Sequence, residues 1–165
     1  MNKDLIVDFS EFDRNEVLYD RAAIERVNPH RHELSLLDGI LFEDHASRRY
    51  VGFCDAKPTD FWTRGHFPGR PVFPGVLMCE AVFQTGALLM ALKGEAAGNS
   101  KTALVTRIQG CKFKNMAKPG DDLHIKVDFV EMLANAAFMK GKITAEGKTI
   151  MTIEFAATIV ENGEV

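Results

Sequence analysis

The sequence predicts an α+β domain in which an antiparallel sheet of five or six strands packs against one long buried helix. Two observations lead to this fold class. The last third of the chain alternates apolar and polar residues with a period of two, which is typical of strands with one buried face. Residues 76–92 are apolar almost all round, which is typical of a helix enclosed by the rest of the protein.

Length and composition are those of a single globular domain, residues 1–165, with residues 1–19 as an N-terminal extension. The net charge of −3 gives no argument for a nucleic-acid or anionic membrane partner. Three cysteines without a CxxC spacing indicate neither a disulfide framework nor a zinc site. The start of the chain shows no signal-peptide pattern, so we expect a cytoplasmic protein.

The first third of the chain alternates short elements. Residues 1–16 are acidic with scattered apolar residues, and either a strand or an arm on a neighbour fits them. The remaining elements are a helix at 20–27 with an Asp cap and a stop at Asn28-Pro29, then strands at 33–43 and 48–57 joined by a polar turn at 44–47.

A loop at residues 65–75 holds three prolines and three glycines in eleven residues. Proline fixes backbone angles and glycine frees them, so such a loop can hold one side chain in a set position. We expect that side chain to be His66. Three other histidines, His30, His32 and His45, lack the ligand spacing of a metal site and are interpreted as solvated loop residues.

The helix after this loop runs from Val76 to Leu92, and Lys93-Gly94 would end it. We expect it to be too short and too polar in its middle to span a membrane. Glu80 is its anomaly, because a carboxylate in an apolar helix must have a raised pKa, be tightly hydrogen-bonded, or both. Gln84 lies four residues on, on the same face, and can orient it. Cys79 is interpreted as a core thiol.

Beyond a loop at 95–101, the remaining chain is predicted to be strands. Turns at 134–135 and 146–147 would join the last three into a meander. Their apolar face needs a cover, and the buried helix is the candidate. The expected inward residues are Leu123, Ile125, Val127 and Phe129, then Ala137, Met139, Ile143 and Ala145, then Met151, Ile153, Phe155, Ala157 and Ile159.

Residues 65–77, with Glu80 and Gln84 after them, resemble the signature of the β-hydroxyacyl-(acyl carrier protein) dehydratases of the FabZ and FabA kind. Weaker matches flank them, at 28–31 with 36–38 and at 112–114 with 118–121. The resemblance thus covers most of the chain from 27 to 160. It implies a hot-dog fold, in which the sheet wraps the long helix, and a homodimer or trimer of dimers with sites at the subunit interface.

The resemblance also implies the roles of individual residues. His66 matches the catalytic histidine, Glu80 matches the catalytic acid fourteen residues later, and Gln84 matches its supporting amide. A glutamate at this position favours the FabZ branch, since FabA-like enzymes carry aspartate. In the family the histidine of one subunit faces the acid of the other.

The chemistry of such a pair suits dehydration of a (3R)-3-hydroxyacyl thioester to a trans-2-enoyl thioester. Neutral His66 can take the C2 proton, and a desolvated Glu80 can protonate the departing hydroxyl group. The backbone N–H of Gly75 at the helix N-terminus can stabilise charge on the thioester oxygen. Neither a metal nor an organic cofactor is needed.

The substrate is expected to arrive on acyl carrier protein, an acidic partner that calls for a local basic patch. Candidates for that patch are Arg64, Arg70, Arg107, Lys112 and Lys114. Substrate-binding candidates are Phe67, Val72, Phe73, Val76 and Phe83, and Trp62, Met78 and Val82 are further candidates for lining an acyl tunnel. The alternatives are a hot-dog acyl thioesterase, a CoA-linked enoyl hydratase, and a catalytically idle subunit that pairs with an active paralogue.

Overall fold

The computed structural model describes residues 12–92 and 101–161. Within these ranges two α-helices and two short 3-10 helices accompany the strands. The strands are β1 (Tyr19–Asp20), β2 (Gly39–Asp44), β3 (Arg49–Asp55), β4 (Lys101–Phe113), β5 (Asp122–Leu133), β6 (Ala136–Ala145) and β7 (Lys148–Glu161); the α-helices are α1 (Arg21–Glu25) and α2 (Gly75–Leu92); the 3-10 helices are His32–Leu34 and Phe61–Arg64.

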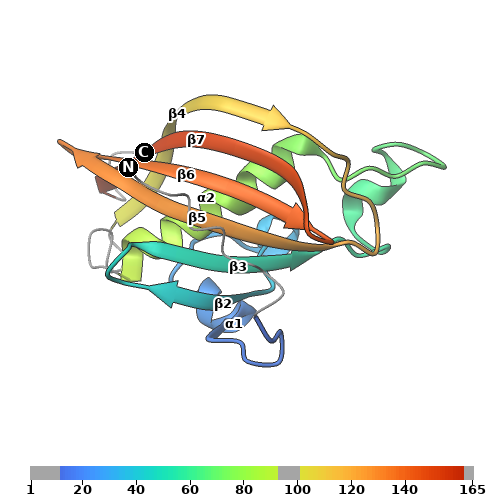
Figure 1. The fold of residues 1–165 in the computed structure, drawn as a ribbon, viewed down its shortest axis with the longest axis horizontal. Coiled ribbons are helices and arrows are strands. Elements are labelled where there is room, and N and C mark those ends of the chain that lie inside the picture. The colour runs from blue at the N-terminus through green and yellow to red at the C-terminus, as the bar shows by residue number, and fades with distance from the viewer. Residues whose placement is uncertain (1–11, 93–100, 162–165) are drawn as a thin grey trace.

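The strands form one antiparallel sheet with the order β1-β2-β3-β5-β6-β7-β4. The sheet curves across α2, which runs behind β5, β6 and β7 in Figure 1. This confirms the predicted fold class. The described part of the chain has seven strands and not five or six, because β1 adds two residues, Tyr19 and Asp20, opposite Ile40 and Gly39. A strand of two residues is too short to show any periodicity.

The meander β5-β6-β7 follows the predicted alternation. Leu123, Ile125 and Val127 on β5 are fully buried, and their polar neighbours are not. The turn between β6 and β7 places Glu146 and Gly147 at positive φ, 48° and 72°. Two positive φ values in a two-residue loop give the turn whose twist matches that of the paired strands.

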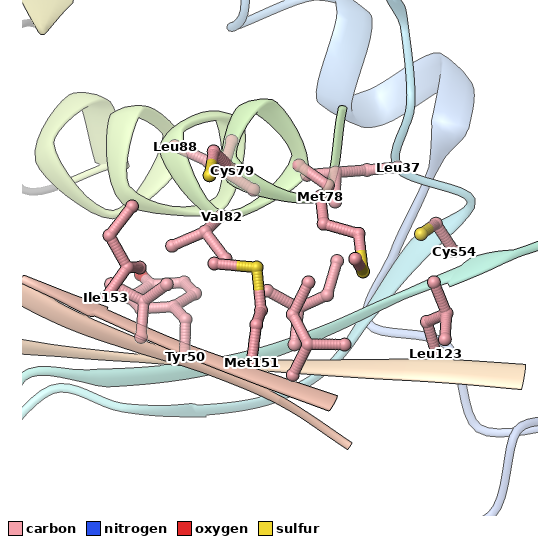
Figure 2. Close-up of a cluster of buried hydrophobic side chains, with 14 of the residues drawn as sticks. Leu37, Tyr50, Cys54, Met78, Cys79, Val82, Leu88, Leu123, Met151 and Ile153 are labelled. Carbon is pink, nitrogen blue, oxygen red and sulfur yellow. The ribbon is translucent and has the colours of Figure 1, made fainter. Parts of the chain in front are cut away.

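Helix α2 is sealed against the inner face of the sheet. Val82, Leu88 and Leu89 are 0–1% exposed, and Figure 2 shows Val82 between the helix and the strands and Leu88 in the same buried cluster. The helix passes β6 so closely that a Cβ on Gly141 would lie 2.3 Å from Cγ1 of Val82. Only glycine at position 141 therefore permits this approach of helix and sheet.

The expectation that this helix cannot span a membrane was wrong on length and composition. Gly75–Leu92 has a mean hydropathy of 1.6 and is long and apolar enough to cross one. However, 56% of this segment is buried inside the protein. A core helix of a globular domain meets the same length and composition test, and the enclosing sheet gives α2 that role here.

The strand predicted at 33–43 begins only at Gly39. Residues 32–34 form a 3-10 helix, and His32 has a φ of 56°. Side chains from elsewhere hold the backbone after it: Arg21 donates to the carbonyl of Ser35, and Gln84 accepts from the N–H of Leu36 at 3.1 Å. These bonds replace strand pairing over this segment.

The predicted N-terminal helix is confirmed as α1. The Asp20 side chain caps it by accepting from the N–H of Ala23 at 2.8 Å. Residues 1–11 of the expected extension, and the predicted helix stop at 93–94, lie outside the described residues. In the described part of the extension, Arg14 pairs with Asp55 and Asp122 and lies over the ring of Phe53.

Candidate active site

The loop that carries His66 is held by its own backbone. The N–H of His66 donates to Trp62 at 2.9 Å, and the N–H of Val72 donates back to the carbonyl of His66 at 2.8 Å. Phe67 and Arg70 exchange two further backbone bonds inside the loop, and the peptide bond between His66 and Phe67 is cis. The loop therefore has a closed, specific conformation, as its glycines and prolines predicted.

The hydrogen bond made by the His66 ring sets its tautomer. Nδ1 lies 2.8 Å from the carbonyl oxygen of Val72, which can only accept, so Nδ1 carries the proton. Nε2 is then the unprotonated nitrogen. The ring also stacks on Phe67, with 4.2 Å between ring centroids. His66 is thus a half-buried imidazole with a basic nitrogen in a fixed orientation.

The end of the loop leads directly into α2. The N–H of Phe73 donates to Ala117 at 2.8 Å, and Gly75 begins the helix. A Cβ at position 75 would lie 2.8 Å from the ring of Phe113 on β4. Because the first N–H groups of a helix have no partner within it, this end of α2 presents donors beside an aromatic ring.

Glu80 lies one turn into α2 and is hydrogen-bonded. Gln84 donates from Nε2 to Oε1 of Glu80 at 2.8 Å, as the four-residue spacing predicted. Gln84 is itself 2% exposed and is fixed through its amide, which donates to Leu34 at 2.6 Å and accepts from Leu36. The amide therefore joins Glu80 to the chain that precedes β2.

His30 also contacts Glu80, which corrects its interpretation as a solvated histidine. Its Nε2 lies 3.1 Å from Oε1 of Glu80, and the side chain is 29% exposed. The sequence held a signal for this residue, because Asn28-Pro29-His30-Arg31 is one of the weaker family matches. The other two histidines do lie in loops: His32 is exposed, and His45 is 61% exposed beside Glu43.

The pKa of the Glu80 carboxyl lies below its ordinary value. The hydrogen bond from His30 is the largest cause, desolvation opposes it, and the bond from Gln84 adds to the lowering. Of the two alternatives the sequence left open, hydrogen bonding is present and a raised pKa is not. In this protomer Glu80 is a carboxylate at neutral pH.

One face of α2 stays open beside the buried one. Its half-buried or exposed residues follow helical spacing at Val76, Glu80, Phe83 and Ala87. Val76 is 75% exposed, and Phe83 packs on Phe155 with 4.9 Å between ring centroids. This open stripe, defined by those four residues, is an apolar track with one carboxylate in it.

The other predicted substrate residues lie at different depths. Phe67 is 55% exposed and Val72 is half-buried beside it. Phe73 is 3% exposed and packs on Trp62, with 4.8 Å between centroids. Met78 and Val82 are likewise buried in the core.

His66 and Glu80 share no hydrogen bond within residues 12–92 and 101–161 of the protomer. The imidazole of His66 is bound to Val72, and the carboxylate of Glu80 to His30 and Gln84. Across the described ranges there is no group of three His, Cys, Asp or Glu side chains arranged to hold a metal ion. The structure thus brings together Glu80, Gln84 and His30, and places His66 separately on its loop.

Cys79, next to Glu80, is a core residue as predicted. It is 8% exposed, and its Sγ lies 3.8 Å from Sγ of Cys111 on β4. Burial raises the pKa of the Cys79 thiol to about 12, so it is uncharged at neutral pH. Cys79 therefore packs in the core as a small apolar side chain.

Sequence comparisons extend over most of the chain. The FabA-like domain model matches residues 28–154. The FabZ 3-hydroxyacyl-[acyl-carrier-protein] dehydratase of Bacillus subtilis is 33% identical over 144 residues, 87% of this chain and all of that protein. The Campylobacter jejuni protein of the same name is 32% identical over 146 residues, 87% of this chain and 99% of that one.

Solved structures support the fold at lower identity. A chain of the dehydratase heterocomplex ApeI:P from Xenorhabdus doucetiae has a TM-score of 0.54 at 23% identity, covering 70% of this chain and 92% of that one. A hot-dog-like protein from Thermanaerovibrio acidaminovorans gives 0.58 at 12% identity, covering 70% and 83%. The sheet around α2 is accordingly a hot-dog fold, and with the matched residues 28–154 the chain belongs to the FabA-like family, on its FabZ branch.

Proposed function

We propose that this protein is a 3-hydroxyacyl-[acyl-carrier-protein] dehydratase that converts (3R)-3-hydroxyacyl-ACP to trans-2-enoyl-ACP in fatty-acid or related acyl-chain synthesis. The observation that carries the proposal is the pair of oriented groups, His66 and Glu80. Each has one atom held by hydrogen bonds and one left for chemistry: Nε2 of His66 and Oε2 of Glu80. Relatives named as FabZ dehydratases align with 83–89% of the chain.

In the elimination the C2–H and C3–O bonds break, the C2–C3 double bond forms, and water leaves. Nε2 of His66 is the base that takes the C2 proton. Glu80 binds the 3-hydroxyl group through its carboxyl group and assists its departure as water. Because the Glu80 carboxylate holds no proton to give, the proton that Nε2 of His66 takes from C2 is the one delivered to the departing hydroxyl group, so the His66 and Glu80 pair ends with the proton count with which it began.

Charge that develops on the thioester oxygen falls at the N-terminus of α2. The N–H of Gly75 begins the helix, and the helix dipole adds to its effect. The chemistry requires no metal or organic cofactor.

The complete site is proposed to form between two copies of the chain, in a homodimer or a trimer of dimers. Strand β4 lies at an edge of the sheet and exposes Leu104, Val105, Ile108 and Phe113 at 37–55%. An exposed apolar strand edge is a surface that proteins cover. A second copy on β4 would bring the partner's loop toward the open stripe of α2.

The acyl chain is proposed to lie along the open stripe, since its residues present apolar surface on both sides of Glu80. Phe67 and Val72 would contact the substrate near the thioester, the buried Phe73 would act through its packing on Trp62, and Val76 and Phe83 would contact the substrate along the helix. Phe83 lies about one turn beyond Glu80, away from Gly75, so it would meet the far part of the acyl chain.

The carrier protein is proposed to dock beside the catalytic loop. A cleft of about 440 Å³ includes Val72, whose carbonyl holds His66, and carries the cations Arg70, Lys118 and Lys148 with the acids Asp121 and Glu146. A Lys118→Glu/Lys148→Glu variant should raise KM for acyl-ACP and leave KM for a short pantetheine thioester unchanged. Equal effects on both substrates would argue against docking there. The reaction is expected to take place in the cytoplasm.

The test of the reaction is the absorbance of the enoyl thioester when pure protein meets 3-hydroxyacyl-ACP of several chain lengths. Wild type should convert the substrate, and His66→Ala should lose roughly 10²–10⁴-fold in rate. No conversion by a folded oligomer would refute the proposal. Release of free thiol would point to a thioesterase, conversion of acyl-CoA alone to a hydratase, and activity only with a paralogue to an idle subunit.

The shared site has its own test, in which the inactive variants His66→Ala and Glu80→Gln are unfolded together, refolded and assayed. If each site combines His66 of one subunit with Glu80 of the other, random pairing restores about one quarter of wild-type activity, because half of the dimers are mixed and each has one intact site. A mixture that stays inactive would place both residues of a site in one subunit.

A further inference from the structure

The segment that carries His30, residues 28–36, is hydrogen-bonded to α2 at both of its ends. The Asn28 side chain, 3% exposed, donates to the carbonyl of Gln84 at 2.9 Å. At the other end the Gln84 amide bonds Leu34 and Leu36. One turn of α2 therefore fixes residues 28–36 and sets His30 across Glu80.

His30 and Gln84 meet the same oxygen of the acid. Both bind Oε1 of Glu80, at 3.1 Å and 2.8 Å, and Oε2 has no hydrogen-bond partner among the described residues. When two groups hold the same oxygen of a carboxylate, the plane of that carboxylate is fixed. Its second oxygen is then directed by the first.

The surroundings of His30 indicate which form of its ring makes this contact. A carboxylate accepts only, so Nε2 carries a proton. Nδ1 is buried and has no hydrogen-bond partner in the described parts of the chain. A protonated Nδ1 would bury an N–H without an acceptor, which proteins rarely do, so the neutral ring with its proton on Nε2 fits the site.

We propose that His30 is a positioning residue for Glu80, donating from Nε2 to Oε1 so that Oε2 alone faces the substrate hydroxyl group. This role rests on the proposed dehydratase function and adds to it a third residue outside the loop and the helix. His30 acts through Glu80 and does not touch the reacting atoms. The lowered pKa of Glu80, of which the His30 bond is the largest cause, agrees with this geometry.

The test uses a matched pair of variants, His30→Gln and His30→Asn. Both carry a neutral amide donor, but the glutamine amide reaches as far as Nε2 of histidine and the asparagine amide is one bond shorter. His30→Asn should lower kcat roughly 10–100-fold with little change in KM, since it removes a hydrogen bond to a charged group. His30→Gln should stay within about threefold of wild type.

The pH profile gives a readout that a purely structural role would not move. Loss of a donor to the carboxylate raises its pKa, so the limb of the profile that belongs to Glu80 shifts to higher pH in His30→Asn and not in His30→Gln. The other ionisable groups near this pair are Cys79, next to Glu80 in α2, and Arg31, which bonds the carbonyls of Asn28 and His30. Both remain in the two variants.

A titration of Glu80 by carbon NMR of glutamate-labelled protein, assigned with Glu80→Gln, separates this inference from the proposed function. If wild type is inactive but His30→Asn still raises the Glu80 pKa, the function fails and the positioning contact stands. Equal rates and titrations in wild type and His30→Asn would overturn the proposal. If His30→Asn does not fold, a His30→Gln variant with lost activity and a raised Glu80 pKa would also overturn it.

Discussion

One face of α2 is closed against the sheet, and the other carries Glu80 on the open stripe. On the closed face, Val82 and Leu89 are 0% exposed and leave no room for change. On the open stripe, Val76 is 75% exposed and Phe83 is half-buried. The same eighteen residues thus have two roles: one face packs the core, and the other is the face proposed to contact a substrate and a partner. Substitutions on the two faces should separate stability from activity.

The largest separation is expected for Glu80→Gln on the open stripe. The amide keeps the shape of the side chain but can neither ionise nor exchange a proton, so the rate of dehydration should fall roughly 10²–10⁴-fold. Thermal unfolding should stay close to that of wild type near neutral pH. Glu131→Gln, on an exposed position of β5, is the control and should change neither quantity. If Glu80→Gln unfolded at a clearly lower temperature than wild type, the open stripe would contribute to stability as well, against the separation of the two faces.

The same variant tests the lowered pKa of Glu80. A carboxyl group with a depressed pKa in the folded state stabilises the fold above its unfolded pKa, and this stabilisation is lost as pH falls through the folded pKa. Wild type should therefore lose more stability than Glu80→Gln on acidification below the ordinary carboxyl pKa of 4.5. Denaturant midpoints of both proteins across this range would show it; parallel curves would contradict the lowered pKa.

On the closed face, Leu89→Ala should do the opposite. Removing a fully buried side chain leaves a cavity and costs about 2–5 kcal/mol in the free energy of unfolding. The rate per folded active site should remain near that of wild type. Leu89→Met, which keeps the volume, should cost less than about 1.5 kcal/mol. Urea unfolding measures both, and a stable but inactive Leu89→Ala would mean that this face also serves the reaction.

A smaller loss is expected where the sheet meets the closed face. Gly141→Ala places a Cβ 2.3 Å from Cγ1 of Val82, so helix or strand must move. Such overpacking costs typically about 1–3 kcal/mol. The double variant Gly141→Ala/Val82→Ala removes the clashing methyl group and should cost less than the two single changes added together. Additive losses would show that Val82 is not what position 141 meets.

The smallest effect is expected at Phe83, where the open stripe continues beyond Glu80. Phe83→Ala should raise the rate with longer acyl chains relative to short ones by roughly tenfold, the scale of a few methylene groups in an apolar pocket. Phe83→Leu should shift the preference less. Competition between chain lengths on the carrier measures the ratio. An unchanged preference in both variants would remove Phe83 from the acyl path.

Local pattern was enough to predict the sheet and the helix. The inward residues of β5 to β7 repeat every second position, and residues 76–92 are apolar almost all round, so periodicity indicated the strands and composition indicated the buried helix. The pair His66 and Glu80 came from residue types, spacing and resemblance. These signals depend on neighbours in sequence, which a single chain displays directly.

What local pattern could not show depends on contacts between distant residues. His30 and Glu80 are fifty positions apart, and the bonds of Asn28 and Gln84 help to bring them together. The same amide gives the segment before β2 partners that are not strands, so the predicted strand at Glu33 started too early. The direction of the Glu80 pKa likewise followed from His30, whose position no periodicity reveals.

The two edges of the sheet are unequal, and this bears on how the protein must be made. β1 closes one edge with two residues, whereas β4 leaves thirteen at the other, with large apolar side chains. If β4 is covered by a second copy, as proposed, then a newly synthesised chain without a partner keeps a long apolar edge strand exposed to other unfolded chains. Dilution should therefore favour proteolysis of the monomer over assembly, and limited proteolysis at graded protein concentrations would show it.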